Sequence, residues 1–408
     1  MTLARSVPTR RVVPAAVVVA ILLLGLNLRG PIIAVSPVLD TIAADLHIGE
    51  ATAGLLTSLP VLCFGLLTPF ASALLARAGL GRGVSISLAV LLVGIAVRSV
   101  DGLVGALAGT VLIGAAITVG NIAVPVVIGR DLRRHSGTVL GAYTASLNVG
   151  SMLTLALTVP LSDALGWRPA LVVWGGLVLV AAAVWWFAVR DPAVRDPDAD
   201  EQHAGSPSSP PAADGTRAWW RRPVVWGLTA AFSGQAFAYY GVTAWLPLLL
   251  RDELGMAPAG AGTSASIFQV AALVGAFGVP VLLRVLPGPR AAVIVVTAAW
   301  STLPLGLLAA PQLWPVWCGV GGAAQGGGLV VIFALIVRRA RDLADNRRMS
   351  ALVQGGAYVV AATGPTVVGA AHAVTAGWTV PLLVVLVAVA LFGVAATASA
   401  GPGDRRTT

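Results

Sequence analysis

The chain has 408 residues, of which 57% are hydrophobic and 11% are charged, and its mean hydropathy is +0.88. This composition excludes a soluble globular domain and indicates a chain that crosses a membrane many times. The formal net charge is +9 and every basic residue is an arginine. Most of these arginines cluster in short breaks between apolar runs, without the interleaved aromatic residues of a nucleic-acid-binding face, so a nucleic-acid partner is also excluded.

The apolar runs are each about 20 residues long, the length that a helix needs to cross the hydrocarbon core of a bilayer. The first run follows Arg5, Arg10 and Arg11, as in a signal peptide, but it is too long and more runs follow, so it is predicted to remain as the first span. A first set of six spans is predicted at residues 13–37, 51–76, 83–100, 103–129, 137–161 and 168–189. A second set of six is predicted at residues 223–250, 260–286, 290–310, 313–337, 349–372 and 377–399.

The segment between the two sets is rich in Pro, Ser, Ala and Asp, which is typical of a flexible linker. We therefore expect an N-terminal six-helix bundle over residues 1–190, a cytoplasmic linker over 191–220 and a C-terminal six-helix bundle over 221–408. The halves also resemble each other, since SPVLD at 36–40 aligns with LPLLL at 246–250. Parallel six-helix repeats are typical of transporters with a site at the repeat interface.

The arginines predict the orientation, because cytoplasmic loops carry an excess of positive charge. All arginines except Arg29, Arg98, Arg168 and Arg251 fall in the termini, the linker and the alternate loops that would share one side of the membrane. The sequence thus predicts an all-α membrane protein with twelve transmembrane helices, arranged as two six-helix bundles, with both termini in the cytoplasm.

Arg29 lies inside the first span, in the stretch GLNLRGPIIAV. Its guanidinium keeps its charge, and placing such a group near the middle of a bilayer costs at least about 2.5–3.5 kcal/mol. A buried partner is therefore expected, but every Asp and Glu falls in a loop or at the end of a span. We infer that Arg29 faces a central cavity, where its planar fork of donors matches a small anion, a carboxylate or a nitro group.

Other polar side chains fall near the depth of Arg29 once each helix is given its direction. The candidate substrate-binding residues are Arg29, Asn27, Tyr239, Gln269, Gln354 and Tyr358, with Asn121, Gln235 and Gln325 as weaker candidates. Tyr143, Asn148 and Tyr240 belong to the same polar set. The alternative for each residue is ordinary packing, since an amide in a membrane helix often hydrogen-bonds a neighbouring helix for about 0.6 kcal/mol.

No residue pattern indicates an enzyme, a metal site or a cofactor. Cys63 and Cys318 lie in apolar runs without the spacing of a metal or redox motif, and are expected to be inert packing residues. His47, His135 and His203 fall in loops. His372, at the end of a span, is interpreted as incidental, so transport is expected to proceed without a proton carried by the protein.

Several segments resemble one family of permeases. The stretch LNLRGPIIAVSPVLDTIAADL, followed by GLLTSLPVLCFGLLTPFA and GIAVRS, is similar to the cyanate and 2-nitroimidazole permeases of the major facilitator superfamily. The likeness continues through GNIAVPVVIGRDL, LGAYTASLNVGS and YYGVTAWLPLLL and covers essentially the whole chain. It implies the two-bundle fold of that superfamily and an inner-membrane permease for a small solute, with Arg29 at the position of the family's helix 1 arginine.

The sequence therefore predicts a secondary transporter that moves a small anionic or nitro-bearing solute by alternating access. The protein is expected to be a multi-pass monomer of the bacterial cytoplasmic membrane, in contact with lipid and without a cofactor, metal or nucleic-acid partner. Two alternatives stay open. One is export of a neutral aromatic drug-like compound, in which Arg29 organises water, and the other is a membrane receptor or scaffold without flux.

Overall fold

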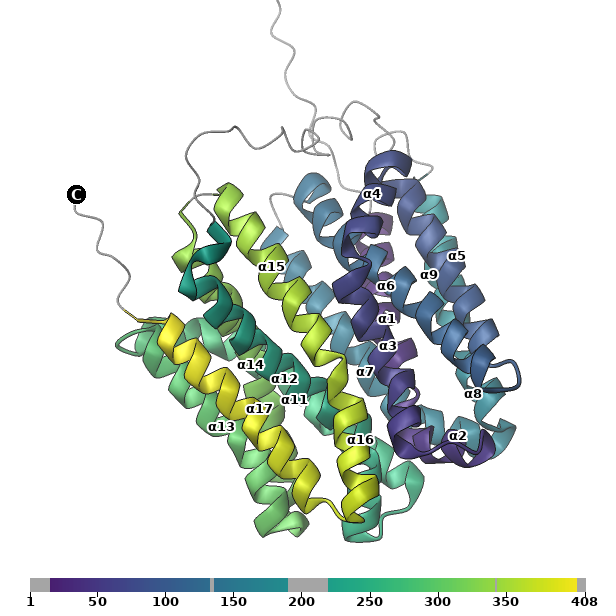
Figure 1. The fold of residues 1–408 in the computed structure, drawn as a ribbon. Helices are drawn as coiled ribbons and strands as arrows, with labels where there is room; N and C mark the ends of the chain where they lie inside the picture. Colours follow the sequence, from purple (N-terminus) through teal and green to yellow (C-terminus); the bar gives the residue numbers. More distant parts are fainter. Residues whose placement is uncertain (1–14, 133–135, 190–218, 342, 402–408) are drawn as a thin grey trace, which may run out of the picture.

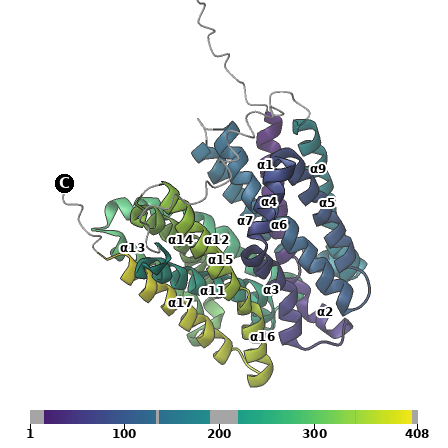
Figure 2. The ribbon, with the colours of Figure 1, turned by 45° about the horizontal axis from the view of Figure 1, so that its top comes forward.

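The computed structural model describes residues 15–132, 136–189, 219–341 and 343–401. Within these ranges every regular element is a helix, and the helices form two bundles that lie side by side (Figures 1 and 2). The N-terminal bundle is coloured purple to teal in both views, and the C-terminal bundle teal-green to yellow.

Both bundles consist mainly of long helices, and short connections join each helix to the next. The N-terminal bundle consists of α1 (Ala15–Ile33), η1 (Ser36–Val38), α2 (Leu39–Asp45), α3 (Glu50–Leu66), α4 (Thr68–Ala78), α5 (Leu80–Arg98), α6 (Leu103–Asp131), α7 (Ser136–Leu165), α8 (Trp167–Val173) and α9 (Gly175–Val189). The C-terminal bundle consists of η3 (Trp219–Arg221), α11 (Pro223–Leu254), α12 (Pro258–Val285), α13 (Pro289–Ala309), η4 (Pro311–Leu313), α14 (Trp314–Arg339), α15 (Leu343–Ala361), α16 (Thr363–Thr375) and α17 (Thr379–Ser399).

Among the described residues, 10 candidate spans are long and apolar enough to cross a membrane, and α3 with α4 brings the number to 11 when the bent pair is counted as one span. Helix α11, with 32 residues, is also long enough but lies outside this set. It is more polar because it carries Gln235, Tyr239 and Tyr240. Length and composition therefore support up to 11 of the twelve predicted spans.

Three predicted spans are broken into two helices each: α3 with α4, α8 with α9, and α15 with α16. The break between α3 and α4 lies at Leu67 and bends the span by 61°. Pro69, in the first turn of α4, has no backbone N–H to continue the hydrogen bonds of α3. The bend therefore follows from the local sequence.

The predicted bounds of the two bundles, 1–190 and 221–408, stay predictions, since the residues between Val189 and Trp219 lie outside the described ranges. The linker predicted at 191–220 lies outside the described residues, except for Trp219 and Trp220 in η3. Its role and the placement of both termini stay predictions.

We call the end of the molecule that holds α2 and α16 the outer end, at the bottom of Figure 1, and the opposite end the inner end. The arginine bias of the loops predicts that the inner end faces the cytoplasm. Across the interface α3 contacts α15 and α16, and α7 contacts α12.

Two glycines in the outer halves of their helices allow the bundles to touch. A Cβ built on Gly54 of α3 would lie 2.9 Å from the Cα atom of Thr366 in α16, and one built on Gly262 of α12 would lie 2.5 Å from the backbone oxygen of Leu155 in α7. Both distances are shorter than a real Cβ contact. The bundles therefore meet with backbone against backbone near the outer end.

Candidate functional site: a polar cavity between the bundles

A cavity of about 420 Å³ lies between the two bundles. It is lined from both sides, by α1, α3, α4, α6 and α7 of the N-terminal bundle and by α11, α14 and α15 of the C-terminal bundle. The lining reaches from Arg29 to Pro125 and Ala351, which lie towards the inner ends of α6 and α15. The cavity therefore occupies the middle and the inner half of the interface.

Arg29 projects from α1 into this cavity and contacts both bundles. Its Nη1 atom donates to Asn148 Oδ1 of α7 and to Tyr239 Oη of α11, each at 3.4 Å, and its Cζ atom lies 5.4 Å from the centre of the Tyr239 ring. Both hydrogen bonds are long. Among the described residues no carboxylate forms an ion pair with Arg29. The guanidinium therefore keeps most of its capacity for a ligand.

Tyr239 is held in place by a short chain of hydrogen bonds within the C-terminal bundle. Its hydroxyl donates to Gln269 Oε1 at 3.3 Å, and Gln269 Nε2 donates to Thr243 Oγ1 at 3.2 Å. Because the Tyr239 proton is directed to Gln269, a lone pair of its oxygen is left to accept from Arg29. Gln269 thus orients a neighbour of Arg29.

All four tyrosines of the chain line the cavity: Tyr143, Tyr239, Tyr240 and Tyr358. The Tyr239 and Tyr240 ring centres are 4.9 Å apart in an edge-to-face arrangement. Tyr358 makes similar contacts with Phe232 at 5.4 Å. Tyrosine offers a flat apolar face and a polar tip. These walls can therefore contact a flat ring while their hydroxyls meet its polar substituents.

The structure brings most of the candidate residues to this region. Arg29, Asn121, Tyr239, Gln354 and Tyr358 line the central cavity. Gln235 and Gln325 line a smaller side pocket of about 90 Å³, which Arg29 also lines.

Asn27 and Gln269 are not among the residues that line either space. The Asn27 amide donates to the backbone oxygens of Leu23 at 2.8 Å and Leu177 at 3.2 Å, and so joins α1 to α9. Two residues along a helix turn the side chain by roughly 200°, so Asn27 points away from the face that carries Arg29. Its role in the structure is helix packing.

Several residues around Arg29 were outside the candidate set. Tyr143, Asn148 and Tyr240 stood at the right depth in the sequence, but nothing there distinguished them from packing residues. Thr118 and Thr144 also contribute to the lining. Threonine is frequent in membrane helices, so these two positions gave no signal.

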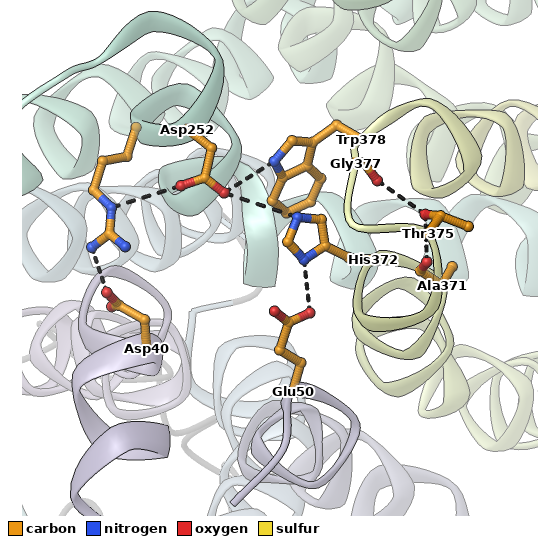
Figure 3. A network of polar contacts seen from close by, with 9 residues as sticks. Asp40, Glu50, Asp252, Ala371, His372, Thr375, Gly377 and Trp378 are labelled. Atoms are coloured by element: carbon orange, nitrogen blue, oxygen red, sulfur yellow. Dashed lines mark hydrogen bonds and ion pairs between the residues drawn. The ribbon is translucent and has the colours of Figure 1, made fainter.

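At the outer end a cluster of charged side chains connects the two bundles (Figure 3). Arg251 of α11 pairs with Asp40 of α2, and His372 Nδ1 of α16 lies 2.7 Å from Glu50 Oε2 of α3. Both contacts join one bundle to the other. Asp252 Oδ2 lies 3.9 Å from His372 Nε2.

His372 is firmly placed in this cluster. Its ring stacks on Trp378 with 4.2 Å between the centres, and Trp378 Nε1 donates to Asp252 Oδ2 at 3.2 Å. The structure gives His372 a partner in the opposite bundle, and its expected lack of a role in proton coupling stays a prediction. Deeper in the interface, Ser58 of α3 and Thr366 of α16 share a hydrogen bond of 3.0 Å.

Two helical bundles around a polar cavity, joined at one end, define a multi-pass membrane transport protein. The model of the Major Facilitator Superfamily matches residues 16–321, and the chain belongs to this family. The family is one of transporters and not of enzymes, as the sequence predicted.

The relatives confirm the likeness to the cyanate and 2-nitroimidazole permeases. The chain is 32% identical to the uncharacterized transporter YycB of Bacillus subtilis, over 93% of this chain and 92% of the relative. It is 29% identical to the 2-nitroimidazole transporter of Escherichia coli, over 93% and 94% of the two chains. It is 24% identical to the cyanate transport protein CynX of the same organism, over 88% and 90%.

A solved structure shows the same fold. A bacterial homolog of the human lysosomal transporter Spinster, in an inward-facing and occupied conformation, superposes with a TM-score of 0.71 at 15% identity. The match covers 94% of this chain and 95% of that one. The predicted two-bundle fold is therefore confirmed.

Proposed function

We propose that this secondary transporter moves a small polar or anionic solute across the bacterial cytoplasmic membrane by alternating access, with Arg29 as the central residue that recognises the solute. The observation that carries the proposal is the position of Arg29 in the cavity, with two hydrogen bonds of 3.4 Å and no carboxylate partner among the described residues. A solute with a negative end would complete the contacts of this charge.

The named relatives support this class of solute. The E. coli proteins transport 2-nitroimidazole and cyanate by their names, and the two compounds share a small size and a delocalised negative end. A nitro group or a carboxylate can accept two parallel hydrogen bonds from one guanidinium.

A second candidate is export of a neutral aromatic compound, and the four tyrosines favour it. A cavity with this many flat faces can bind a ring through stacking alone. In this case Arg29 organises water and makes no direct contact with the solute.

The test is uptake of radiolabelled 2-nitroimidazole and of labelled cyanate into proteoliposomes containing the wild type, Arg29→Ala or Arg29→Lys. We expect Arg29→Ala to lose at least about tenfold in affinity, because a hydrogen bond to a charged group contributes about 1.5–3 kcal/mol. Arg29→Lys should recover little, since a point charge does not reproduce the fork.

Arg168→Ala is the matched control. Arg168 pairs with Asp45 and Asp101 within the N-terminal bundle, away from the cavity, so its loss removes one arginine without touching the proposed site. Uptake by Arg29→Ala equal to that of Arg168→Ala would contradict the proposal. Wild-type transport of neutral aromatic compounds, unaffected by Arg29→Ala, would favour the second candidate.

A further inference from the structure

The side pocket continues the central cavity into the C-terminal bundle. It lies between α11, α12 and α14, and Arg29, Tyr239, Tyr240 and Tyr358 line both spaces. Its volume of about 90 Å³ exceeds the roughly 10–15 Å³ that one water molecule needs. A solute held by Arg29 can therefore extend a second group into this pocket.

Two glutamine side chains line the pocket, and a hydrogen bond fixes the orientation of the Gln235 amide. Gln235 of α11 donates from Nε2 to the backbone oxygen of Gln325 in α14, at 2.7 Å. This contact sets the orientation of the Gln235 amide, because the reverse orientation would bring its oxygen against a carbonyl oxygen. Gly328 leaves room for this arrangement, since a Cβ at that position would lie 3.0 Å from Gln235 Oε1.

One atom of each of these two amides has no hydrogen-bond partner among the described residues. Gln235 Oε1 and Gln325 Nε2 are both buried and unpaired, in side chains that are 3% and 5% exposed. The other buried unpaired side-chain atoms of the described residues belong to Ser36, Arg98, Trp167 and Arg168, towards the outer end of the N-terminal bundle. The wall of the proposed binding region thus contains one unpaired acceptor and one unpaired donor, both covered by neighbouring atoms, so a solute contacts them after a small movement of the glutamine side chains. Native proteins rarely leave such atoms unused.

We propose that Gln235 Oε1 and Gln325 Nε2 are specificity-determining groups that bind the donor and acceptor atoms of the solute's second group. The proposal rests on the proposed function, because it requires that Arg29 binds the negative end. The preferred solute then carries a nitro or carboxylate group at one end and, at the other, a flat group with one N–H and one acceptor nitrogen or oxygen. A linear anion such as cyanate fills only the Arg29 part of the site.

The test compares three probes that differ by one group: 2-nitroimidazole, 1-methyl-2-nitroimidazole, which lacks the N–H, and 2-nitropyrrole, which lacks the acceptor nitrogen. Equilibrium binding to the purified full-length protein is measured by calorimetry or thermal shift. We expect the wild type to bind 2-nitroimidazole about tenfold more tightly than either analogue, since a site built for a polar group rejects a ligand that leaves this site unpaired.

Two variants test which glutamine contacts the N–H of the probe and which contacts its acceptor nitrogen. Gln235→Met should remove the preference over the N-methyl analogue, and Gln325→Met should remove the preference over the pyrrole. The ratio of two probes is measured on one variant, so a general loss of affinity cancels. Gln325→Met removes an unpaired buried amide and so should fold at least as stably as the wild type.

The outcomes separate this proposal from the proposed function. Arg29→Ala should weaken binding of all three probes and leave their ratios unchanged. Equal binding of the three probes by the wild type, still dependent on Arg29, would overturn the glutamine site alone and mean that packing or water accounts for the amides. Binding of no probe by the wild type would overturn both.

Discussion

The outer end and the middle of the bundle interface differ in the partners that they offer to a charged side chain. At the outer end, Arg251 has carboxylate neighbours in Asp40 and Asp252, and the side chains of these residues are about one-third exposed. In the middle, Arg29 has only Asn148 and Tyr239 as described hydrogen-bond partners, and the space beside it is a cavity. The outer charges hold the bundles together, whereas the central charge is available to a solute.

The proposed alternating access requires the interface to open at the outer end, and the contacts there are of a kind that can separate. The contacts there are ion pairs and hydrogen bonds between polar side chains at the molecular rim, and water can replace each of them when the bundles separate. Separation of the bundles at Gly54 and Gly262 requires no rearrangement of long side chains, because these glycines face backbone atoms of the other bundle. The structure is therefore an outer-closed state of a transporter with a cavity on its inner side.

The largest effect is expected from locking the outer end. Ser58 and Thr366 are hydrogen-bonded across the interface at 3.0 Å, so the double variant Ser58→Cys, Thr366→Cys places two thiols within reach of a disulfide. Oxidation should abolish flux in proteoliposomes, and reduction should restore it, while binding of solute from the inner side persists. Each single cysteine variant is the control. Full flux with the disulfide formed would show that the outer end does not open during transport.

A smaller effect is expected when one outer ion pair is removed. Asp40→Asn weakens the contact with Arg251, and a partly exposed pair contributes about 0.2–1 kcal/mol, so the outer-open fraction should rise by a factor between about 1.4 and about 5. The rate at which a membrane-impermeant maleimide labels Thr366→Cys reports this fraction. Asp163→Asn is the control, because Asp163 of α7 forms no ion pair with the other bundle among the described residues. An unchanged rate would mean that the pair is not part of the closure.

The smallest effect is expected at His372. Its Nδ1 atom lies 2.7 Å from Glu50 Oε2 of the opposite bundle, so this contact forms only while the bundles are together. His372→Ala removes the contact, and labelling of Thr366→Cys should therefore become faster, by at most about twofold for a partly exposed polar contact. His47→Ala is the control, because the His47 ring contacts the backbone oxygen of Asp45 in its own bundle. An unchanged labelling rate in His372→Ala would show that this contact does not stabilise the closed outer end.

The positions of the spans could be predicted from the sequence, whereas the breaks inside them could not. Hydropathy averaged over about 20 residues is unchanged by a local break. The bend at Leu67 and the break between α15 and α16 therefore lay hidden inside single predicted spans. Pro69 was a signal for the first of them, but proline is also common in straight membrane helices.

The depth of polar residues could be predicted, but their direction could not. Asn27 and Arg29 are neighbours in depth and point to different partners, because direction depends on which helix packs on each face. Gln269 was placed in the site by its depth, yet it reaches the site only through Tyr239. His372 and Glu50 are 322 residues apart in the chain, so their contact depends on how the bundles dock.

The central claim is that Arg29 recognises the negative end of the solute, and a binding cycle tests it most directly. The affinities of 2-nitroimidazole and imidazole are measured for the wild type, Arg29→Ala and Arg168→Ala. We predict that the wild type and Arg168→Ala prefer the nitro compound at least about tenfold, since one charge-assisted hydrogen bond exceeds about 1.4 kcal/mol, and that Arg29→Ala binds the two compounds equally. A nitro preference that survives in Arg29→Ala would contradict the claim.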